Sequence, residues 1–233
     1  MKAVFQRGFV PFLIGLAIFS TRVGAQILPA LEPETAALWR AVGVVNADGA
    51  TGTATCTGTL VAPDLVLTAA HCAGGGNRQF LIGGIAAQML STHAAAGITI
   101  NPAYQQAEGA DRFAHDMALI TLATSVPAAI ATPLPLAPDI TADHMAIVGF
   151  HRMRPGALNG SFECPVVDAT PARLILGCQV IAGNSGAPAL VETAAGWQIA
   201  GVVTARMDGA GVHNSLVAPV NDWLRAQVPQ APR

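Results

Sequence analysis

The sequence has few charged and few aromatic residues. Charged side chains make up 11% of the 233 residues, aromatic side chains make up 5%, and tyrosine occurs once. The formal net charge is −2, so the chain lacks the basic surface that nucleic-acid binding requires. Intrinsic disorder is excluded because hydrophobic residues make up 52% of the chain, and disordered chains are poor in them. We therefore expect a folded protein that does not bind nucleic acid.

Long hydrophobic runs are equally scarce. One such run, over 9–19, follows Lys2 and Arg7 and precedes the small residues Val23-Gly24-Ala25. A basic start, a short apolar run and small residues are the three parts of a secretory signal peptide. A membrane-spanning helix would need about 20 apolar residues. We expect residues 1–25 to be a signal peptide cleaved after Ala25, leaving a secreted or periplasmic chain that is free of the membrane.

Cysteine occurs four times, as Cys56, Cys72, Cys164 and Cys178. An exported chain meets an oxidising compartment, where disulfides form. Four cysteines allow three pairings, and sequence alone does not choose among them. Pairing of sequence neighbours is favoured, because each bond would close a loop of about 15 residues and contribute about 3 kcal/mol. A zinc site has less support, since the sequence has no Cys-x-x-Cys motif or paired histidine spacing.

Turn-forming residues are plentiful, whereas helical patterns are nearly missing. The 24 glycines and 16 prolines separate short runs rich in β-branched residues, such as 55–61, 64–68 and 117–122. Runs of this kind are typical of strands. Only the end looks helical, where Asn221 can cap a helix over 222–227. The sequence therefore predicts an all-β protein with a short C-terminal helix.

A proline-rich stretch divides the chain into two halves. Four prolines fall within 127–138, and proline lacks the amide that a central strand needs. We expect a first β domain over 26–130, a connector over 131–140 and a second β domain over 141–233. The start of the first domain, over 26–37, is expected to be an extended lead-in.

One short turn, Gly183-Asn184-Ser185-Gly186-Ala187-Pro188, has the pattern of a nucleophile site. A serine flanked by glycines can present its hydroxyl to a cleft, because glycine adopts backbone angles that other residues resist. The amides of Gly183 and Ser185 could then point at one developing oxyanion. Gly-x-Ser-Gly also occurs in ordinary turns, so the motif alone is a weak signal.

Two upstream residues strengthen this interpretation. His71 follows an apolar run and precedes Cys72, and Asp116 opens the apolar run 117–122. Taken singly, the histidine could be a packed surface residue and the aspartate a turn residue. Acyl transfer, however, needs a hydroxyl nucleophile, an imidazole base and a carboxylate that fixes the imidazole tautomer. His71, Asp116 and Ser185 together predict a catalytic triad.

With these motifs, the chain resembles the trypsin/chymotrypsin-like serine proteases over nearly all of the mature sequence. The segments 56–60 and 67–72 look like the family's first disulfide and histidine block, 116–120 like its aspartate block, and 183–188 like its serine block. The resemblance implies two six-stranded antiparallel β-barrels with the active site between them. The first barrel would carry the histidine and aspartate blocks, and the second would carry the serine block.

The resemblance also implies roles for individual residues. His71 would act as general base and then general acid, Asp116 would orient it, and Ser185 would be the nucleophile. Gly183 and Ser185 would supply the oxyanion-hole amides. Thr204 matches the hydroxyl residue that usually supports the aspartate. The residues expected to bind substrate are Gln179 at the pocket base and Thr204, Ala205 and Arg206 beside the bound peptide.

Four positions depart from the pattern of the family or of its glutamyl endopeptidases. Asn184 stands where the commonest serine block has an aspartate that pairs with a freed α-amino group, so we expect signal-peptide removal alone to give the working enzyme. Gln179 replaces the aspartate of trypsins, which argues against strict Lys/Arg preference. The serine block is also similar to that of bacterial glutamyl endopeptidases, but Val203 stands where those enzymes carry a histidine, so acidic specificity does not carry over. Arg206 could narrow the groove or attract an acidic side chain.

The sequence thus predicts a secreted serine endopeptidase that hydrolyses polypeptides through an acyl-enzyme, as a monomer without metal or cofactor. One alternative is an inactive protease-like binding protein. An esterase of the α/β-hydrolase type fits less well, because Ala187 replaces the second glycine of Gly-x-Ser-x-Gly and the triad order differs. The remaining histidines are expected to be surface or structural residues without evident partners: His93, His115, His144, His151 and His213.

Overall fold

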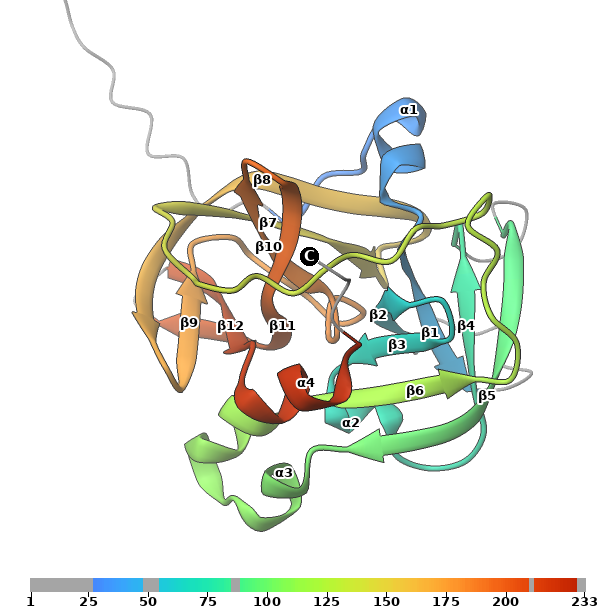
Figure 1. Ribbon diagram of the computed structural model, residues 1–233. Coiled ribbons are helices and arrows are strands. Elements are labelled where there is room, and N and C mark those ends of the chain that lie inside the picture. The colour runs from blue at the N-terminus through green and yellow to red at the C-terminus, as the bar shows by residue number, and fades with distance from the viewer. Residues whose placement is uncertain (1–26, 48–54, 85–88, 210–211, 230–233) are drawn as a thin grey trace, which may run out of the picture.

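The computed structural model describes residues 27–47, 55–84, 89–209 and 212–229, which are arranged mainly as two closed barrels of antiparallel strands (Figure 1). The expected signal peptide, its cleavage point and Gln26 lie outside the described residues. No helix among the described residues is long and apolar enough to cross a membrane.

The first barrel closes in the strand order β1-β2-β3-β6-β5-β4. Each neighbouring pair is antiparallel, and pairing of β1 with β4 closes the ring. Its strands are β1 (Val42–Ala47), β2 (Cys56–Ala62), β3 (Leu65–Thr68), β4 (Arg78–Ile82), β5 (Ser91–Ile100) and β6 (Ala118–Leu122).

The second barrel closes in the order β10-β11-β12-β9-β8-β7, again with antiparallel neighbours. Its strands are β7 (His144–His151), β8 (Arg154–Thr170), β9 (Arg173–Leu176), β10 (Pro188–Thr193), β11 (Gly196–Gly209) and β12 (Val212–Pro219). The prediction of an all-β protein with two six-stranded antiparallel barrels is therefore confirmed.

Apolar side chains fill each barrel and the space between them. Separate buried clusters occupy the first barrel, around Phe80 and Ile120, and the second, around Ile147 and Val217. A third cluster combines residues of both barrels: Val44, Leu67 and Met117 from the first, and Val148, Phe150 and Val202 from the second. Burial of this shared cluster holds the barrels together, because removing apolar surface from water is the main favourable contribution to packing.

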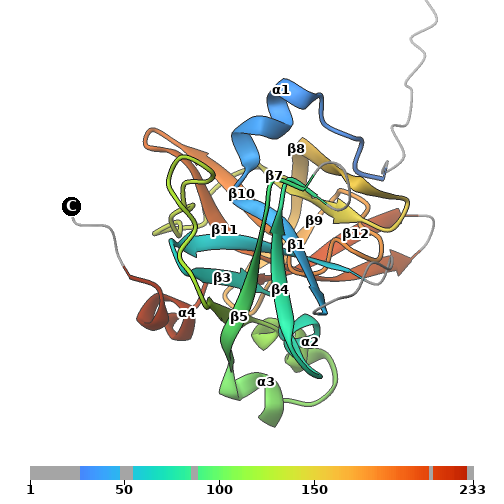
Figure 2. The same cartoon turned by 90° about the vertical axis from the view of Figure 1, so that its right-hand side faces the viewer.

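Short helices lie outside the strands. They are α1 (Pro33–Ala36), α2 (Ala70–Ala73), α3 (Pro102–Gln106) and α4 (Asp222–Gln227), with 3₁₀ turns η1 (Ala37–Trp39) and η3 (Gly109–His115). Asn221 Oδ1 accepts from the Leu224 amide at 3.0 Å, so the predicted cap and C-terminal helix are confirmed. Helices α1 and α3 lie at opposite ends of the molecule in both views (Figures 1 and 2).

The lead-in was predicted to be extended, which is wrong over its second half. Pro33 begins α1, where its missing amide costs no hydrogen bond. The chain then continues into η1, which ends at the buried Trp39. The Trp39 ring packs against Phe162 and Trp197 of the second barrel at centroid distances of 5.6 and 5.7 Å. The helical course of residues 33–39 therefore ends with the Trp39 ring in contact with the second barrel.

The segment between the barrels runs along the second barrel. In Figure 1 this segment, which connects β6 to β7, passes in front of both barrels. Ala137 N donates to Ile199 O, and Ile199 N donates to Pro135 O, both at 2.8 Å. Arg225 of α4 donates to Ala137 O at 2.7 Å, so the terminal helix also holds this segment.

Disulfides join Cys56 to Cys72 and Cys164 to Cys178. Both are the local pairs favoured by the short loops they close, with sequence separations of 16 and 14 residues. The first bond ties the start of β2 to α2, and the second ties β8 to the segment after β9.

Candidate functional site

His71 and Asp116 form a close pair on the first barrel. His71 lies in α2, directly after β3, and Asp116 lies between η3 and β6. The His71 Nδ1 and Asp116 Oδ2 atoms are 2.6 Å apart, and the His71 amide donates to Asp116 Oδ1 at 3.0 Å. The aspartate side chain is 3% exposed and the histidine side chain 38%. Asp116 therefore uses both carboxylate oxygens to hold one histidine, whose outer edge reaches solvent.

The surroundings of Asp116 differ from what the resemblance implied. Thr204 lines the same cavity of about 360 Å³ as His71 and Asp116. Its hydroxyl, however, donates to Leu216 O at 3.2 Å and makes no bond to Asp116. Tyr104 also lines this cavity, and burial together with the negative charge of Asp116 raises its pKa. Its ring packs under the Arg112 guanidinium at 4.2 Å.

The predicted serine turn has a backbone that needs its glycines. Gly183 and Gly186 have φ values of 105° and 84°, in the region that side chains resist. A Cβ atom on Gly186 would overlap the Thr57 carbonyl oxygen, and one on Gly183 would lie 2.6 Å from His151 Cα. These glycines are required both by conformation and by close approach of neighbouring backbone.

Two amides of this turn donate to no acceptor in the described part of the chain. The Asn184, Gly186 and Ala187 amides donate to Ile181 O, Val203 O and Asn184 O at 2.8–3.0 Å. The Gly183 and Ser185 amides have no such bond among the described residues. An unpaired amide in a buried position is costly, and Gly183 is buried. The turn is therefore suited to receive an oxygen atom from outside the chain.

The Asn184 side chain connects the serine turn to the backbone of Phe150 and Ile181. Its side chain is fully buried, Nδ2 donates to Phe150 O at 3.1 Å, and Oδ1 accepts from the Ile181 amide at 3.0 Å. A neutral amide can donate and accept at once, so both ends of the side chain are satisfied by backbone groups. No charged partner is needed here.

Thr57, which the sequence did not single out, connects the two barrels at the serine turn. Its amide donates to Ser185 O at 2.8 Å, and its hydroxyl donates to Gly183 O at 2.8 Å. The same hydroxyl accepts from the Phe150 amide at 2.9 Å, and the Thr57 carbonyl accepts from the Thr68 hydroxyl at 2.8 Å. In the sequence, the only sign of this role was the position of Thr57 next to Cys56, because its bonding partners are distant in the chain.

Ser185 is half-buried and lines a cavity of about 250 Å³. The rest of the lining is apolar except for two arginines: Arg152, Val180, Ile181, Ala182, Val203, Ala205 and Arg206. Ala205 and Arg206 were predicted to lie beside the substrate and are in this wall. Gln179, predicted at the base, is not in the lining and instead pairs with Ile27 in a parallel bridge.

The serine and histidine cavities are adjacent along β11. Val203 and Ala205 line the cavity of Ser185, and Thr204 between them lines the cavity of His71. Ser185 Oγ makes no hydrogen bond to His71 within the described residues. Ser185 therefore lines one cavity, and His71 and Asp116 line its neighbour, with residues of β11 lining both.

The charge of one lining arginine is partly compensated. Arg206 Nε lies 2.6 Å from Asp208 Oδ2, and His213 Nδ1 lies 2.6 Å from Asp208 Oδ1. The hydrogen bond from His213, with the charge of Arg206, holds the pKa of Asp208 below its ordinary value. Arg152 makes no ion pair with a described residue. His213 was expected to have no partner, which is wrong.

His151 was likewise expected to lack a partner, and it has one. The residue is fully buried, and Nε2 lies 3.2 Å from Leu28 O, to which it can only donate. Nδ1 is buried without a hydrogen-bond partner among the described residues. Burial lowers the pKa of His151, since a charged imidazole would lose its hydration. His151 is therefore a neutral, structural histidine.

Metal binding by the site is disfavoured by its sulfur chemistry. Donor atoms of Cys56, His71 and Cys72 lie within 4.8 Å of one another, but both sulfur atoms belong to the disulfide. A disulfide sulfur is not the thiolate that binds zinc. One imidazole is left as a possible ligand in this group.

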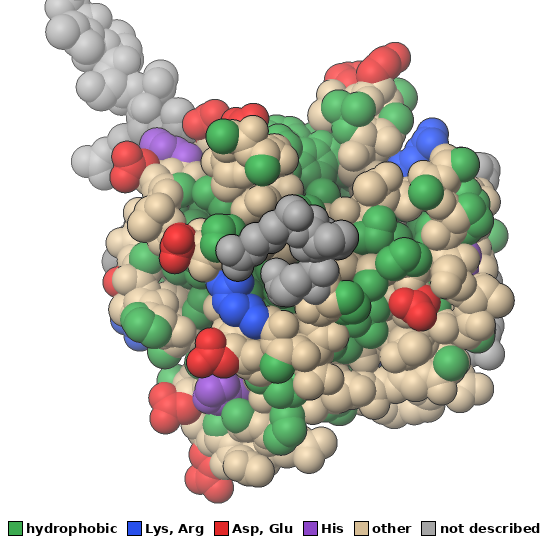
Figure 3. Space-filling view, viewed as in Figure 1, with side chains coloured by type: hydrophobic (Ala, Val, Ile, Leu, Met, Phe, Trp, Pro, Cys, Tyr) green, Lys and Arg blue, Asp and Glu red, His purple; other side chains and the backbone are tan. Residues whose placement is uncertain are grey.

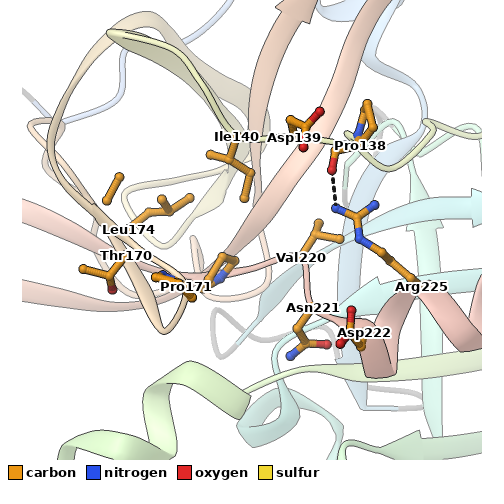
Figure 4. A pocket seen from close by; sticks show the side chains of 12 residues that line it. Pro138, Asp139, Ile140, Thr170, Pro171, Leu174, Val220, Asn221, Asp222 and Arg225 are labelled. Carbon is orange, nitrogen blue, oxygen red and sulfur yellow. Dashed lines mark hydrogen bonds between the residues drawn. The ribbon is translucent and has the colours of Figure 1, made fainter.

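A further cavity, of about 490 Å³, is lined by none of the predicted site residues. It lies between the inter-barrel segment, the second barrel and α4 (Figure 4). Arg225 points across its edge and donates to Pro138 O at 3.0 Å, so this arginine holds the inter-barrel segment against α4.

On the face shown in Figure 3, basic side chains lie scattered and form no patch.

Comparison with known families identifies the fold independently of these contacts. A family model described as Trypsin matches residues 32–224. No curated protein matches the chain. The matched segment includes all twelve strands of the two barrels and every residue lining the cavities of His71 and Ser185.

We predict that Thr57→Val lowers the free energy of unfolding by about 1–3 kcal/mol, because it leaves Gly183 O and the Phe150 amide without their buried partner. Thr57→Ser keeps the hydroxyl and should lose less than half of that. Urea denaturation measures both values. Thr59→Val is the matched control in the same strand, since Thr59 Oγ1 is buried with no partner among the described residues. Equal losses for Thr57→Val and Thr59→Val would contradict this account.

We also predict a pH-dependent contribution of His151. Its folded-state pKa is below the ordinary value, so its contribution is complete above about pH 6.5 and is lost as pH falls, because the unfolded chain then binds the proton. The slope cannot exceed about 1.4 kcal/mol per pH unit for one proton. The difference in urea midpoint between pH 7.5 and 5.5 should be larger for wild type than for His151→Gln. The nearby Arg154 charge is present in both proteins, so an unchanged difference would refute the prediction.

Proposed function

The chain belongs to the trypsin family of serine proteases, and we propose that it is an active, secreted endopeptidase with His71, Asp116 and Ser185 as its triad. The observation that carries this proposal is the double contact of Asp116 with His71 beside a serine turn that has two unused amides. Family membership supports polypeptides as substrates.

Asp116 gives His71 one protonation pattern. Nδ1 carries the hydrogen that is donated to Asp116 Oδ2, which leaves Nε2 as a free base on the exposed side of the ring. The buried carboxylate then stabilises the imidazolium that forms when Nε2 takes a proton. The amide bond from His71 to the other carboxylate oxygen prevents Asp116 from turning away.

Ser185 is the nucleophile in this scheme. As Nε2 of His71 removes the hydroxyl proton, Oγ forms a bond to the substrate carbonyl carbon, and the carbonyl oxygen becomes an oxyanion. The Gly183 and Ser185 amides donate to that oxygen. The imidazolium then gives its proton to the departing amine, the carbon–nitrogen bond breaks, and an acyl-enzyme remains. Water, activated by the same imidazole, releases the acid and restores Ser185.

Activation does not require a buried ion pair. Asn184 is satisfied by backbone groups at both ends of its side chain, so an α-amino group has no carboxylate to meet at this position. We propose that removal of residues 1–25 gives the working enzyme. The two disulfides support an oxidising destination, secreted or periplasmic.

An inactive binding protein is the competing function. Loss of a triad residue or of the oxyanion turn would favour it, but the His71–Asp116 pair is formed and the glycines of the turn are retained. The two unused amides favour an enzyme, because a mere binding surface has no need of unpaired donors next to a serine.

A fluorophosphonate probe, which phosphonylates activated serines, should label the wild type at Ser185. Ser185→Ala should abolish labelling and lower kcat for a cleaved peptide by about 10⁶-fold. Ser125→Ala, at an exposed serine, is the control and should be labelled like wild type. Mass spectrometry of the labelled peptide identifies the modified residue. Absence of labelling in the folded wild type would favour the binding protein.

The cavity beside Ser185 should reject a basic side chain at the residue preceding the cut. Its lining has two arginines and no carboxylate. A positively charged side chain that enters the cavity would be repelled by these arginines, even near the surface. Among peptides that differ only at this residue, kcat/KM for lysine or arginine should be about tenfold below that for alanine or leucine. The double variant Arg152→Gln, Arg206→Gln should narrow the gap. Preferred cleavage after lysine or arginine would refute the assignment of the cavity.

A further inference from the structure

The first described residues of the chain are hydrogen-bonded to the second barrel. We call residues 27–31 the strap. Ile27 pairs with Gln179 in a parallel bridge, and Ala30 pairs with Asn159 in an antiparallel one. The Leu31 amide donates to Leu158 O, and Pro29 O accepts from the Gly160 amide, both at 2.9 Å. The strap thus contacts β8 and the segment that leads into the serine turn.

Leu28 is the centre of this attachment. Its side chain is fully buried in the core of the second barrel, in the same cluster as Cys178 and Val180. Its carbonyl oxygen accepts from His151 Nε2 and Arg154 Nη1, each at 3.2 Å. One residue therefore combines an apolar anchor with a hydrogen bond to a buried histidine.

The segment that Leu28 holds is also the segment that holds the serine turn. Phe150 O accepts from Asn184 Nδ2 at 3.1 Å, and the Arg152 amide donates to Ala182 O at 2.9 Å. Between them, the backbone of His151 lies so close to Gly183 that a Cβ there would be 2.6 Å from His151 Cα. A shift of residues 150–152 would therefore move the backbone of residues 182–184.

We propose that the strap is a positioning device for the oxyanion turn, and that Leu28 and His151 are its positioning residues. The proposal rests on the proposed function of the same site. Docking of Leu28 fixes His151, His151 fixes residues 150–152, and these fix Gly183 and Asn184. Because the strap begins two residues after the expected cleavage point at Ala25, processing and alignment of the catalytic turn involve one continuous segment.

The test compares two variant pairs for turnover and for binding. Leu28→Ala removes the anchor, and Leu38→Ala is the matched control at an exposed leucine of η1. His151→Leu removes the donor to Leu28 O, and His151→Gln, which can still donate, is the conservative rescue. The full processed chain is used throughout, and folding of each variant is checked by near-UV circular dichroism and thermal unfolding.

Two inhibitors separate positioning from simple stability. A peptide aldehyde forms a hemiacetal whose oxygen needs the Gly183 and Ser185 amides, whereas the cleaved product peptide needs only the binding cavity. In Leu28→Ala and His151→Leu, kcat should fall about 10²–10³-fold, the loss typical of a missing oxyanion donor. Aldehyde affinity should fall similarly, and product affinity should change by less than about threefold on that account. His151→Gln and Leu38→Ala should remain near wild type.

Other outcomes overturn the proposal. Folded Leu28→Ala and His151→Leu proteins with lower melting temperatures but wild-type kcat and aldehyde affinity would make the strap a plain stabiliser. If Leu28→Ala does not fold, the His151 pair decides alone. If the folded wild type is not labelled at Ser185, the proposed function fails separately. Positioning is then judged from the NMR shifts of the Gly183 and Ser185 amides, which must change in His151→Leu but not in His151→Gln.

Discussion

The hydrogen bonds of Thr57 are the constraint on which the site depends. This residue belongs to β2 of the first barrel, yet its amide and hydroxyl hold Ser185 O and Gly183 O of the second barrel at 2.8 Å. Removing either contact would leave buried carbonyl groups without donors, at a cost larger than the bond itself contributes. The serine turn is therefore built by both barrels, and neither barrel alone contains a formed site.

The Cys56–Cys72 disulfide extends this arrangement to the histidine. Thr57 follows Cys56 in β2, and His71 precedes Cys72 in α2, so one covalent bond connects the residue that grips the serine turn with the neighbour of the imidazole. The Thr68 hydroxyl, bonded to Thr57 O, adds a second tie from β3. One disulfide, one backbone hydrogen bond and two threonine hydroxyls thus connect the segment of His71 to the segment of Ser185.

Local patterns predicted an all-β chain in two halves and the capped helix at Asn221, because strand composition and capping act over a few residues, whereas the two barrels and the residues beside the substrate were implied by the family resemblance. What the sequence could not reveal depends on contacts between distant segments. Thr57 and His151 matter through partners 93 and 123 residues away, and no local pattern marks such pairs. The bridge between Gln179 and Ile27 is another such contact, since it joins residues that are far apart in the sequence. The helix in the lead-in was missed because its prolines were taken as signs of an extended segment, whereas Pro33 stands at the first helical position and Glu34 and Ala36 are good helix formers.

Asn184 shows how the serine turn can be held in place without a buried ion pair. Burying an ion pair behind the serine turn would require desolvating two charges, which the attraction between them often fails to offset. A buried amide with one donor and one acceptor bond avoids that cost and has no titration of its own. The groups that hold the turn here are neutral, namely the Asn184 side chain and a threonine hydroxyl from the first barrel. Under the proposed function, the catalytic turn would then be aligned by neutral contacts in place of an ion pair.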